Sequence, residues 1–572
     1  MNTRASRRFC AFALVLLCLA GTALAQTTIA DPNDALYADF DAWATKGLLR
    51  NLPRLRPYTN AMVAGLLKEV AASDSELDAA EARRYLGILE VQGLHFRSEV
   101  RAIGVVGKSS PNYFVAAAPA FTLNNLIEGK LGLSGRAVAW AEKNRLEGLQ
   151  PYGTNYDRDL ASGSDANIGG GIDVRQDLTT SMSYGNESIG VQAGFMRGSW
   201  GPIWTDGVVL GPQSPQSGTF SFSWRGEGLS ADIGFMVMRQ GWSSSGVNRD
   251  VSGLLPVGYS GGKYLMVHGV NWAPLPWVEL GLFETMIWSE RIEPLYFVPL
   301  SELFVSQAFT GYGDNSLVGL SGSLYLPENL RFDTVGYIDD FNFSGFLKGV
   351  FDTKWKVAAQ AALSWAPPSP LLQRLALDYT AIGPYMYTHW MNGGSSDSGA
   401  KYNGALAYTN GGLNIGPALD PNSDRVSLTA TSRNLDGFRF TGDLRIIRHG
   451  NASAGVTAYT SATSVSGNAT GDLGDSGKFK VDPLNPSWSD FSIFQGDYDT
   501  GTSPKYLRFL TQQVIQTSVQ VGVGAVYSMP IQGFGLLDAG ASYLFEYIAN
   551  NALVSGATSI RHYFQMRVGM GF

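Results

Sequence analysis

The chain has 572 residues, a formal net charge of −7 and two cysteines, while glycine (68 residues) and aromatic residues (12%) are abundant. The acidic balance argues against a nucleic-acid partner. Both cysteines, Cys10 and Cys18, lie near the N-terminus, so the chain from residue 26 onward has no disulfide, thiol nucleophile or cysteine metal site.

Residues 1–25 have the pattern of a secretory signal peptide. A basic head over 4–8 precedes an apolar run over 12–20, and Ala23-Leu24-Ala25 matches an A-x-A cleavage site. The apolar run is too short to cross a bilayer as a helix. We therefore expect export, with the mature chain starting at Gln26.

Residues 26–95 are predicted to form a small bundle of about three helices. Asp31, followed by proline, is expected to begin the first helix, and Thr59 is expected to cap the second. Ser73 with Glu76 has the spacing of a capping box for the third. We expect this domain to pack against the mouth of the following domain, in the periplasm.

From residue 96 to residue 572, apolar and polar residues alternate with period two in runs of about ten residues, the length of a tilted membrane strand. The last run ends the chain on Phe572, and an aromatic C-terminus resembles the signal that the barrel-assembly machinery reads. The runs are long for a soluble sandwich or propeller. The pattern predicts an all-β transmembrane fold, a large antiparallel outer-membrane β-barrel, and the length allows about 14–20 strands.

Three connections stand out by composition. Residues 144–166 and 449–502 are rich in Gly, Ser, Asn, Asp and Thr and are predicted to be long extracellular loops. Residues 289–312 are too apolar for a solvated loop. We expect that segment to fold inward and obstruct the lumen.

Catalytic and metal motifs are not supported. The five histidines show no metal-ligand spacing and no H-E-x-x-H, so neither a metal nor a cofactor is expected. Gly474-Asp475-Ser476-Gly477 spells a protease loop, but no histidine motif accompanies it. His449 with Ser453 has only a generic spacing, so the chain is not expected to be an enzyme.

Several segments together resemble the Wzi-type capsule assembly proteins. In chain order these are Arg56-Pro57-Tyr58, Trp200-Gly201-Pro202, 312–315, 336–340, 385–389, 416–425 and 506–510. The resemblance implies an outer-membrane barrel of about 18 strands with a helical bundle at its periplasmic end. It also implies a lectin-like role, in which the barrel holds capsular polysaccharide at the surface and aids capsule assembly.

Aromatic rings beside planar polar groups are how proteins commonly hold sugars. The candidate contacts, taken from family-matching segments and nearby aromatic residues, are Trp200, Trp204, Asp314, Asn315, His389, Asp424 and Arg425. The aromatic residues could instead belong to the lipid-facing girdle, and Asp424 with Arg425 could form a lumen ion pair. The expected partners are a surface polysaccharide, the outer-membrane bilayer and the assembly machinery. The alternative functions are a diffusion porin or substrate channel, and a scaffold for a periplasmic partner.

Overall fold

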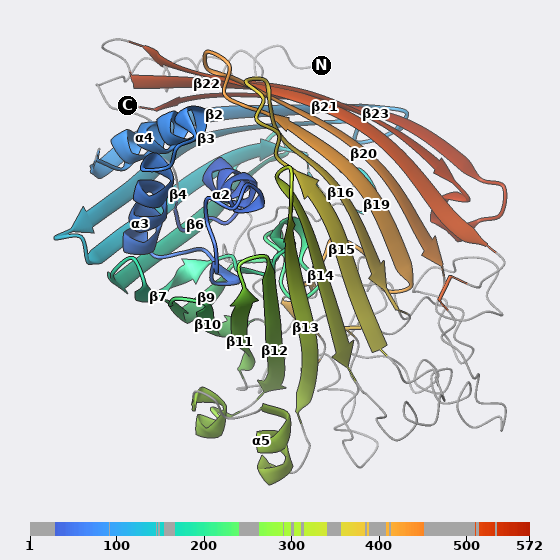
Figure 1. The fold of residues 1–572 in the computed structure, drawn as a ribbon. Coiled ribbons are helices and arrows are strands. Elements are labelled where there is room, and N and C mark those ends of the chain that lie inside the picture. The colour runs from blue at the N-terminus through green and yellow to red at the C-terminus, as the bar shows by residue number, and fades with distance from the viewer. Residues whose placement is uncertain are drawn as a thin grey trace, which may run out of the picture.

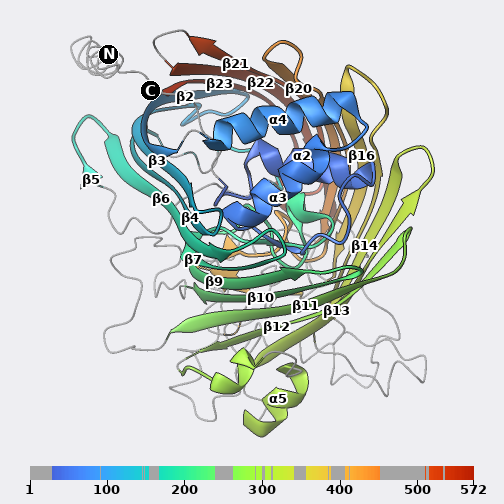
Figure 2. The same cartoon turned by 60° about the vertical axis from the view of Figure 1, so that its left-hand side comes forward.

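The computed structural model shows a closed antiparallel β-barrel with helices inside one end of the ring (Figures 1 and 2). It describes residues 29–90, 92–144, 146, 149–153, 166–238, 262–289, 291–298, 303–310, 314–339, 356–383, 386–387, 406, 408–410, 413–450, 509–510, 514–531 and 535–571. Within these residues, no helix combines the length and the apolar character needed to cross a membrane.

Nineteen described strands form the closed sheet, and eighteen of them build the wall, because β5 (Ala166–Asn167) is a two-residue strand that pairs only with β6. The wall strands are β2 (Gly93–Val106), β3 (Tyr113–Ile127), β4 (Leu131–Lys143), β6 (Ile172–Gly185), β7 (Ile189–Met196), β9 (Ser217–Arg225), β10 (Leu229–Met238), β11 (Lys263–Leu275), β12 (Val278–Ser289), β13 (Asn315–Leu326), β14 (Leu330–Asp339), β15 (Lys356–Trp365), β16 (Leu372–Ile382), β19 (Ser423–Ser432), β20 (Phe438–Gly450), β21 (Ile515–Ile531), β22 (Gly535–Ala549) and β23 (Thr558–Gly571). Each pairs with the next, and β23 pairs with β2 to close the ring. The predicted fold class is confirmed.

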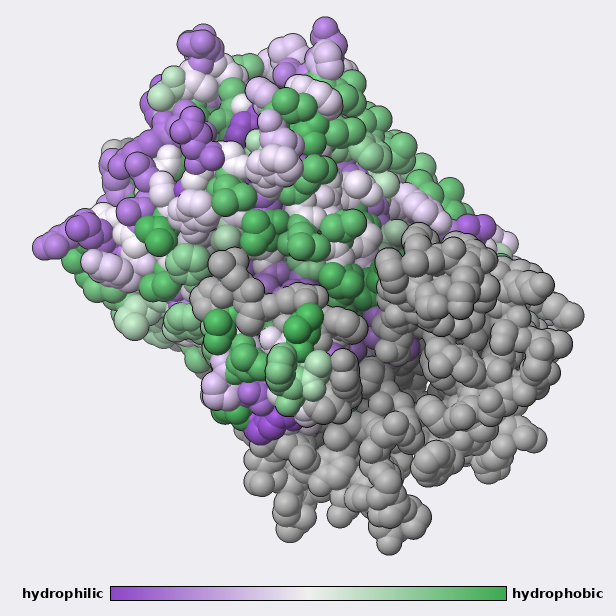
Figure 3. Space-filling view, turned by 60° about the horizontal axis from the view of Figure 1, so that its bottom comes forward, coloured by the Kyte–Doolittle hydropathy of each residue, from purple (hydrophilic) through white to green (hydrophobic). Residues whose placement is uncertain are grey.

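The period-two pattern divides the wall into an outer apolar face and an inner polar face. On β12, Leu280 and Leu282 are 47% and 60% exposed, whereas Glu279, Phe283 and Thr285, in the alternate register, are buried. Figure 3 shows hydrophobic residues gathered along the wall and hydrophilic residues gathered at the upper left rim. This arrangement suits a barrel whose outside meets lipid and whose inside is polar.

The two ends of the barrel differ in how the strands are joined. At one end, here called the short-turn end, neighbouring strands connect through a few residues, such as 128–130, 186–188, 226–228 and 327–329. At the other, the long-connection end, β7 leads to β9 through 197–216, and β16 leads to β19 through 383–422. The N-terminal helices lie inside the ring at the short-turn end (Figure 2).

Three helices precede the first wall strand: α2 (Ala35–Thr45), α3 (Asn60–Ala71) and α4 (Glu76–Glu90). We call residues 29–90 the plug. Thr59 caps α3 as predicted, since its side chain accepts from the Met62 N–H. The other two predicted caps were wrong by two or three residues: Asp34 caps α2, and Ser75, paired with Asp78, precedes α4. Overlapping cap patterns in the sequence caused both errors.

Further segments fill the interior above the plug. β1 (Leu55–Arg56) of the plug pairs with β8 (Ser199–Trp200), which is followed by η1 (Trp204–Asp206). Within the connection between β16 and β19, the described residues include a second small sheet of β17 (Thr409–Asn410) and β18 (Leu413–Asn414). These segments and inward side chains of strands β10 to β16 share one apolar cluster. A dry core therefore occupies much of the lumen on this side.

The prediction for residues 289–312 was wrong for the part of that segment that the structure describes. η3 (Pro294–Phe297) and α5 (Leu303–Thr310) lie outside the ring, beyond β12 and β13 (Figures 1 and 2). They pack on outward-facing residues of β11 and β12. The segment is apolar because it covers the outer wall, and an apolar composition alone does not separate an inward segment from an outward one.

Several predicted features lie outside the described residues. These are the signal peptide 1–25, His389, Ser453, the 474–477 motif, Phe572 and nearly all of the 449–502 loop.

Candidate functional site: two arginine groups at the rim of a filled barrel

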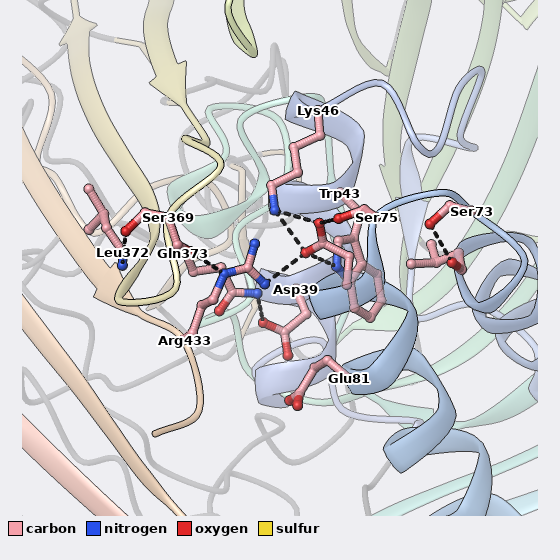
Figure 4. Close-up of polar contacts among 12 residues, drawn as sticks. Asp39, Trp43, Lys46, Ser73, Ser75, Glu81, Ser369, Leu372, Gln373 and Arg433 are labelled. Atoms are coloured by element: carbon pink, nitrogen blue, oxygen red, sulfur yellow. Dashed lines mark hydrogen bonds and ion pairs between the residues drawn. The ribbon is translucent and has the colours of Figure 1, made fainter. Parts of the chain in front are cut away.

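A cluster around Asp78 joins the plug to the wall, and Figure 4 labels Trp43, Lys46, Ser75 and Arg433, which all bind its carboxylate. The Asp78 carboxylate, fully buried, accepts from Lys46 at 2.7 Å and from Trp43 Nε1 at 3.1 Å within the plug. Arg433, from the turn between β19 and β20, donates to the same carboxylate at 2.9 Å. Burial alone raises the pKa of Asp78, but the hydrogen bonds from Lys46, Ser75 and Arg433 outweigh it and hold that pKa below its usual value.

Two further plug carboxylates are held by wall arginines. Asp39 lies 3.0 Å from Arg439 of β20, and Asp41 lies 2.5 Å from Arg331 of β14 and 2.6 Å from Arg374 of β16. For Asp41, burial raises the pKa, but the two guanidinium groups outweigh it and bring the pKa below its usual value. The plug is therefore tied to strands on one side of the ring through charged pairs.

Next to these pairs along the ring, the plug also reaches strands β10, β12 and β13. The Arg54 guanidinium lies 2.8 Å from Glu279 of β12, and the Arg54 N–H donates to Asp232 of β10 at 2.6 Å. Arg54 also donates to Ser323 of β13 at 3.2 Å. Polar contacts to the plug thus extend along the wall from β10 to β20.

The two tryptophan candidates are packing residues in this structure. Trp200 is 1% exposed, and its ring centroid lies 4.1 Å from that of Phe283 on the inner wall. A Cβ added to Gly269 would lie 3.2 Å from the Trp200 ring, so even a methyl group there would require the indole to shift by a few tenths of an ångström. Trp204 is 5% exposed and lies beside Tyr37 of the plug. Their contact with a sugar stays a prediction, and neither indole presents an open face.

Asp424 and Arg425, adjacent in the chain, do not pair with each other. Neighbouring strand residues point to opposite faces. Arg425 points inward and binds Asp206 of η1, while Asp424 points outward and binds Arg448 of β20. The lumen ion pair weighed for Asp424 with Arg425 is therefore wrong in its partner, and the lumen pair is Arg425 with Asp206.

The outward group at Asp424 forms the first rim group, which consists of Asp424, Arg448 and Tyr379. Asp424 accepts two hydrogen bonds from the Arg448 guanidinium and one from the Tyr379 hydroxyl at 3.1 Å. The Asp424 side chain is 4% exposed, whereas that of Arg448 is 51% exposed. A shielded carboxylate thus holds a half-exposed guanidinium at the long-connection end of the outer wall.

A second rim group repeats this chemistry at Asp314, next to β13. The Asp314 carboxylate lies 2.5 Å from Arg291, and the Tyr296 hydroxyl donates to it at 2.6 Å. Asp314 is 2% exposed in its side chain and Arg291 is 42% exposed. Burial and the neighbouring Asp314 carboxylate raise the pKa of the Tyr296 phenol, so Tyr296 stays a neutral donor.

The remaining described candidates lie inside the barrel. Asn315 is buried and donates to the Leu406 carbonyl at 2.9 Å, which attaches the 383–422 connection to β13. His449 is buried and its Nδ1 lies 2.8 Å from the Ser423 hydroxyl. Among the described residues, no group of three or more acidic, histidine or cysteine side chains could hold a metal ion.

Sequence reasoning missed the arginines of both rim groups and the tyrosines of the inner core. Arg448 follows the outward pattern of Leu444 and Ile446 on β20, so a basic residue in an apolar register was the available signal. Tyr387 and Tyr408 donate to the carbonyls of Val208 and Val209 and hold the inward segments together. No spacing in the sequence links the two rim arginines, Arg291 and Arg448, to Tyr387 and Tyr408.

Comparisons with known proteins support the fold. No protein-family model matches the chain, and no curated protein matches it. Wzi of Escherichia coli, described as an outer-membrane protein involved in group 1 capsule assembly and a carbohydrate-binding β-barrel, is 12% identical with a TM-score of 0.53. The match covers 95% of this chain and 99% of that one. OccD3 and OprD of Pseudomonas aeruginosa also match, at 12% and 9% identity with TM-scores of 0.39 and 0.40, over 84% of this chain and 92% and 95% of theirs. The chain has the fold of a large outer-membrane β-barrel, which supports an outer-membrane location.

Proposed function

We propose that this barrel holds a surface polysaccharide, of the kind that forms capsules, and catalyses no reaction on it. In this proposal the signal peptide is removed, the assembly machinery recognises Phe572, the plug faces the periplasm, and the long-connection end faces outward. The single observation that carries the proposal is the pair of rim groups, which present two half-exposed guanidinium planes at the outward end.

The chemistry of the rim groups fits a polyhydroxylated or carboxylated sugar. A guanidinium offers several N–H donors in one plane, which suits paired hydroxyl or carboxylate oxygens. Asp314 and Asp424 each take up part of that fork and fix its direction, so little side-chain freedom is lost on binding. Two separated weak contacts gain strength when one polymer engages both.

The filled interior favours a holding role over free diffusion. The described residues of 199–216 and 406–420 share a core with the wall. The Tyr152 N–H also donates to Glu546, and the Tyr152 carbonyl accepts from Gln520. The plug is fixed below them by buried ion pairs. An open porin of similar strand number keeps a wide aqueous channel through this space.

The test is binding of polysaccharide prepared from the surface of the source cells to the purified, refolded barrel, measured by surface plasmon resonance. We expect the double variant Arg291→Ala, Arg448→Ala to bind at least about tenfold more weakly, because one charge-assisted hydrogen bond contributes about 1.5–3 kcal/mol. Arg84→Ala is the matched control, since Arg84 is also 42% exposed but lies on α4 in the plug. Failure of the unaltered barrel to bind would refute the function, whereas equal binding by the double variant would refute only the site.

A specific observation favours a solute channel as the second candidate. Thr441 on β20 and Gln565 and Arg567 on β23 point inward and are nevertheless exposed, so water reaches the inner wall beside these strands. Conductance in planar bilayers separates the two functions. A large steady current from the unaltered protein would favour the channel, and we expect only small currents.

A further inference from the structure

The outer wall is covered where η3 and α5 lie against it. On β11 and β12, even-numbered residues face outward, as the 56% exposure of Trp272 and the 60% exposure of Leu282 show. In the same outward register, Met266, Met286 and Trp288 are completely buried. They form one apolar cluster with Tyr296 of η3 and Leu303 of α5. At this patch the outer wall is therefore covered by protein, whereas the rest of the outer face is exposed.

The covered patch lies at a height where a bilayer would otherwise touch the wall. Leu280, opposite Trp272, is near the short-turn end of β12, and Trp288 is eight residues further along the strand. Eight residues of a strand tilted by about 40° rise roughly 20 Å, which is within the apolar band of about 25 Å on such barrels. With Leu280 taken as the lower edge of the band, Met286 and Trp288 fall in its upper half.

The segment also covers a polar pair on the outer face. His268 and Glu284 lie opposite each other on β11 and β12, with His268 Nδ1 3.6 Å from Glu284 Oε1. The N–H of Leu303, at the start of α5, donates to the same Glu284 oxygen at 2.8 Å. If the pair were exposed to acyl chains, Glu284 would lose the hydrogen bond from Leu303, and burying the polar groups in lipid would cost free energy. The Glu284 carboxylate instead fixes the beginning of α5 to the wall.

The far face of the segment is itself apolar. Phe309 is 82% exposed, Val305 and Val298 are each 49% exposed, and Ile292 is 56% exposed. The eight residues of α5 include no charged side chain. The middle of α5 is held at the second rim group, where Gln307 donates to the Asp314 carbonyl at 2.5 Å. A helix fixed at two points thus turns a row of large apolar side chains away from the barrel.

We propose that η3 and α5 form a lipid-contacting foot, whose far face is covered by the acyl chains of the outer leaflet. Lipid is the occupant because the foot lies within the height of the apolar band and its exposed face continues the lipid-facing face of the neighbouring strands. On β13 beside it, Val318 and Leu320 are 42% and 65% exposed in the outward register. The foot widens the barrel within one leaflet and shields the polar pair beneath it.

The test uses single cysteines, because the chain from residue 26 onward contains none. Val305→Cys and Phe309→Cys variants are labelled with bimane and placed in phosphatidylcholine vesicles with or without brominated acyl chains. Val523→Cys, on the lipid face of β21, is the membrane control, and Ala80→Cys, exposed on α4, is the aqueous control. All four positions are exposed, so the substitutions leave the folded core intact.

We expect brominated lipid to quench the labels at Val305 and Phe309 as strongly as the label at Val523. Iodide in the buffer is expected to quench them several-fold less than the label at Ala80. Iodide quenching equal to that at Ala80, without quenching by brominated lipid, would overturn the proposal. Efficient cross-linking between two barrels through the introduced cysteines, without lipid quenching, would assign the face to a second copy and overturn it as well.

Discussion

Replacing Asp78 with asparagine tests whether buried charge holds the plug inside the barrel. The substitution keeps the size of the side chain but removes its charge, which leaves Lys46 and Arg433, 7% and 9% exposed, without their shared carboxylate. Removing one partner of a buried ion pair costs about 3–5 kcal/mol. At 1.4 kcal/mol for each factor of ten, the opening equilibrium of the plug should rise by roughly two to four orders of magnitude.

Amide hydrogen exchange measured on the folded barrel gives this quantity directly. A larger opening equilibrium of the plug raises exchange in α2, α3 and α4. The wall strands are joined by their own closed ladder and keep their protection. Glu76→Gln is the matched control, because Glu76 is an exposed carboxylate in the first turn of the same helix. Its loss should cost at most about 1 kcal/mol. Equal exchange in the Asp78→Asn and Glu76→Gln variants would refute the reasoning.

Two further predictions concern acid and the inner core. Asp41 and Asp78 have folded-state pKa values below the usual 3.8, so their stabilisation is complete above that value and is lost as the pH falls through the lower folded values. The protection factors of α2, which are exchange rates corrected for the intrinsic pH dependence of amide exchange, should therefore stay constant from neutral pH down to the usual value and fall only below it. A fall in protection near neutral pH would contradict this. Trp200→Ala should destabilise the barrel by about 3–5 kcal/mol in urea unfolding, because the buried indole fills the space against Phe283. A change below about 1 kcal/mol would show that the indole is not part of the core.

The wall could be predicted because its signal is local and repeated. Each strand alternates between two environments, so every few residues report the same face again. The helices were likewise visible from their own residues, although the first turns of α2 and α4 were displaced. The stretch from Ser73 to Asp78 contains two overlapping serine–acid patterns, and only the packing of α4 against the wall, where Arg433 meets Asp78, selects the second.

The candidate site was less predictable because its partners are distant in the chain. Asp424 was chosen from a segment rich in turn residues, but the residue that exposes a guanidinium beside it is Arg448, on the next strand. The register that makes them neighbours depends on the connection between β19 and β20. The inward reading of 289–312 failed for a related reason. Lumen core and lipid both accept apolar side chains, and the residues that decide between them, Met286 and Trp288, belong to the wall.

The alternation of the wall also explains why the plug is fastened by charges. An inner face built from the polar half of each strand offers few apolar surfaces at the short-turn end, so a helical segment must supply carboxylates and arginines in the right places. Asp39, Asp41 and Asp78 meet arginines between β14 and β20, and Arg54 meets a carboxylate on β12. Buried ion pairs contribute less to net stability than apolar packing, but they penalise every misplaced arrangement heavily. We infer that the ion pairs determine where the plug sits more than they add to its stability. That position keeps β1 paired with β8 and thereby sets the inward segment that begins at Ser199.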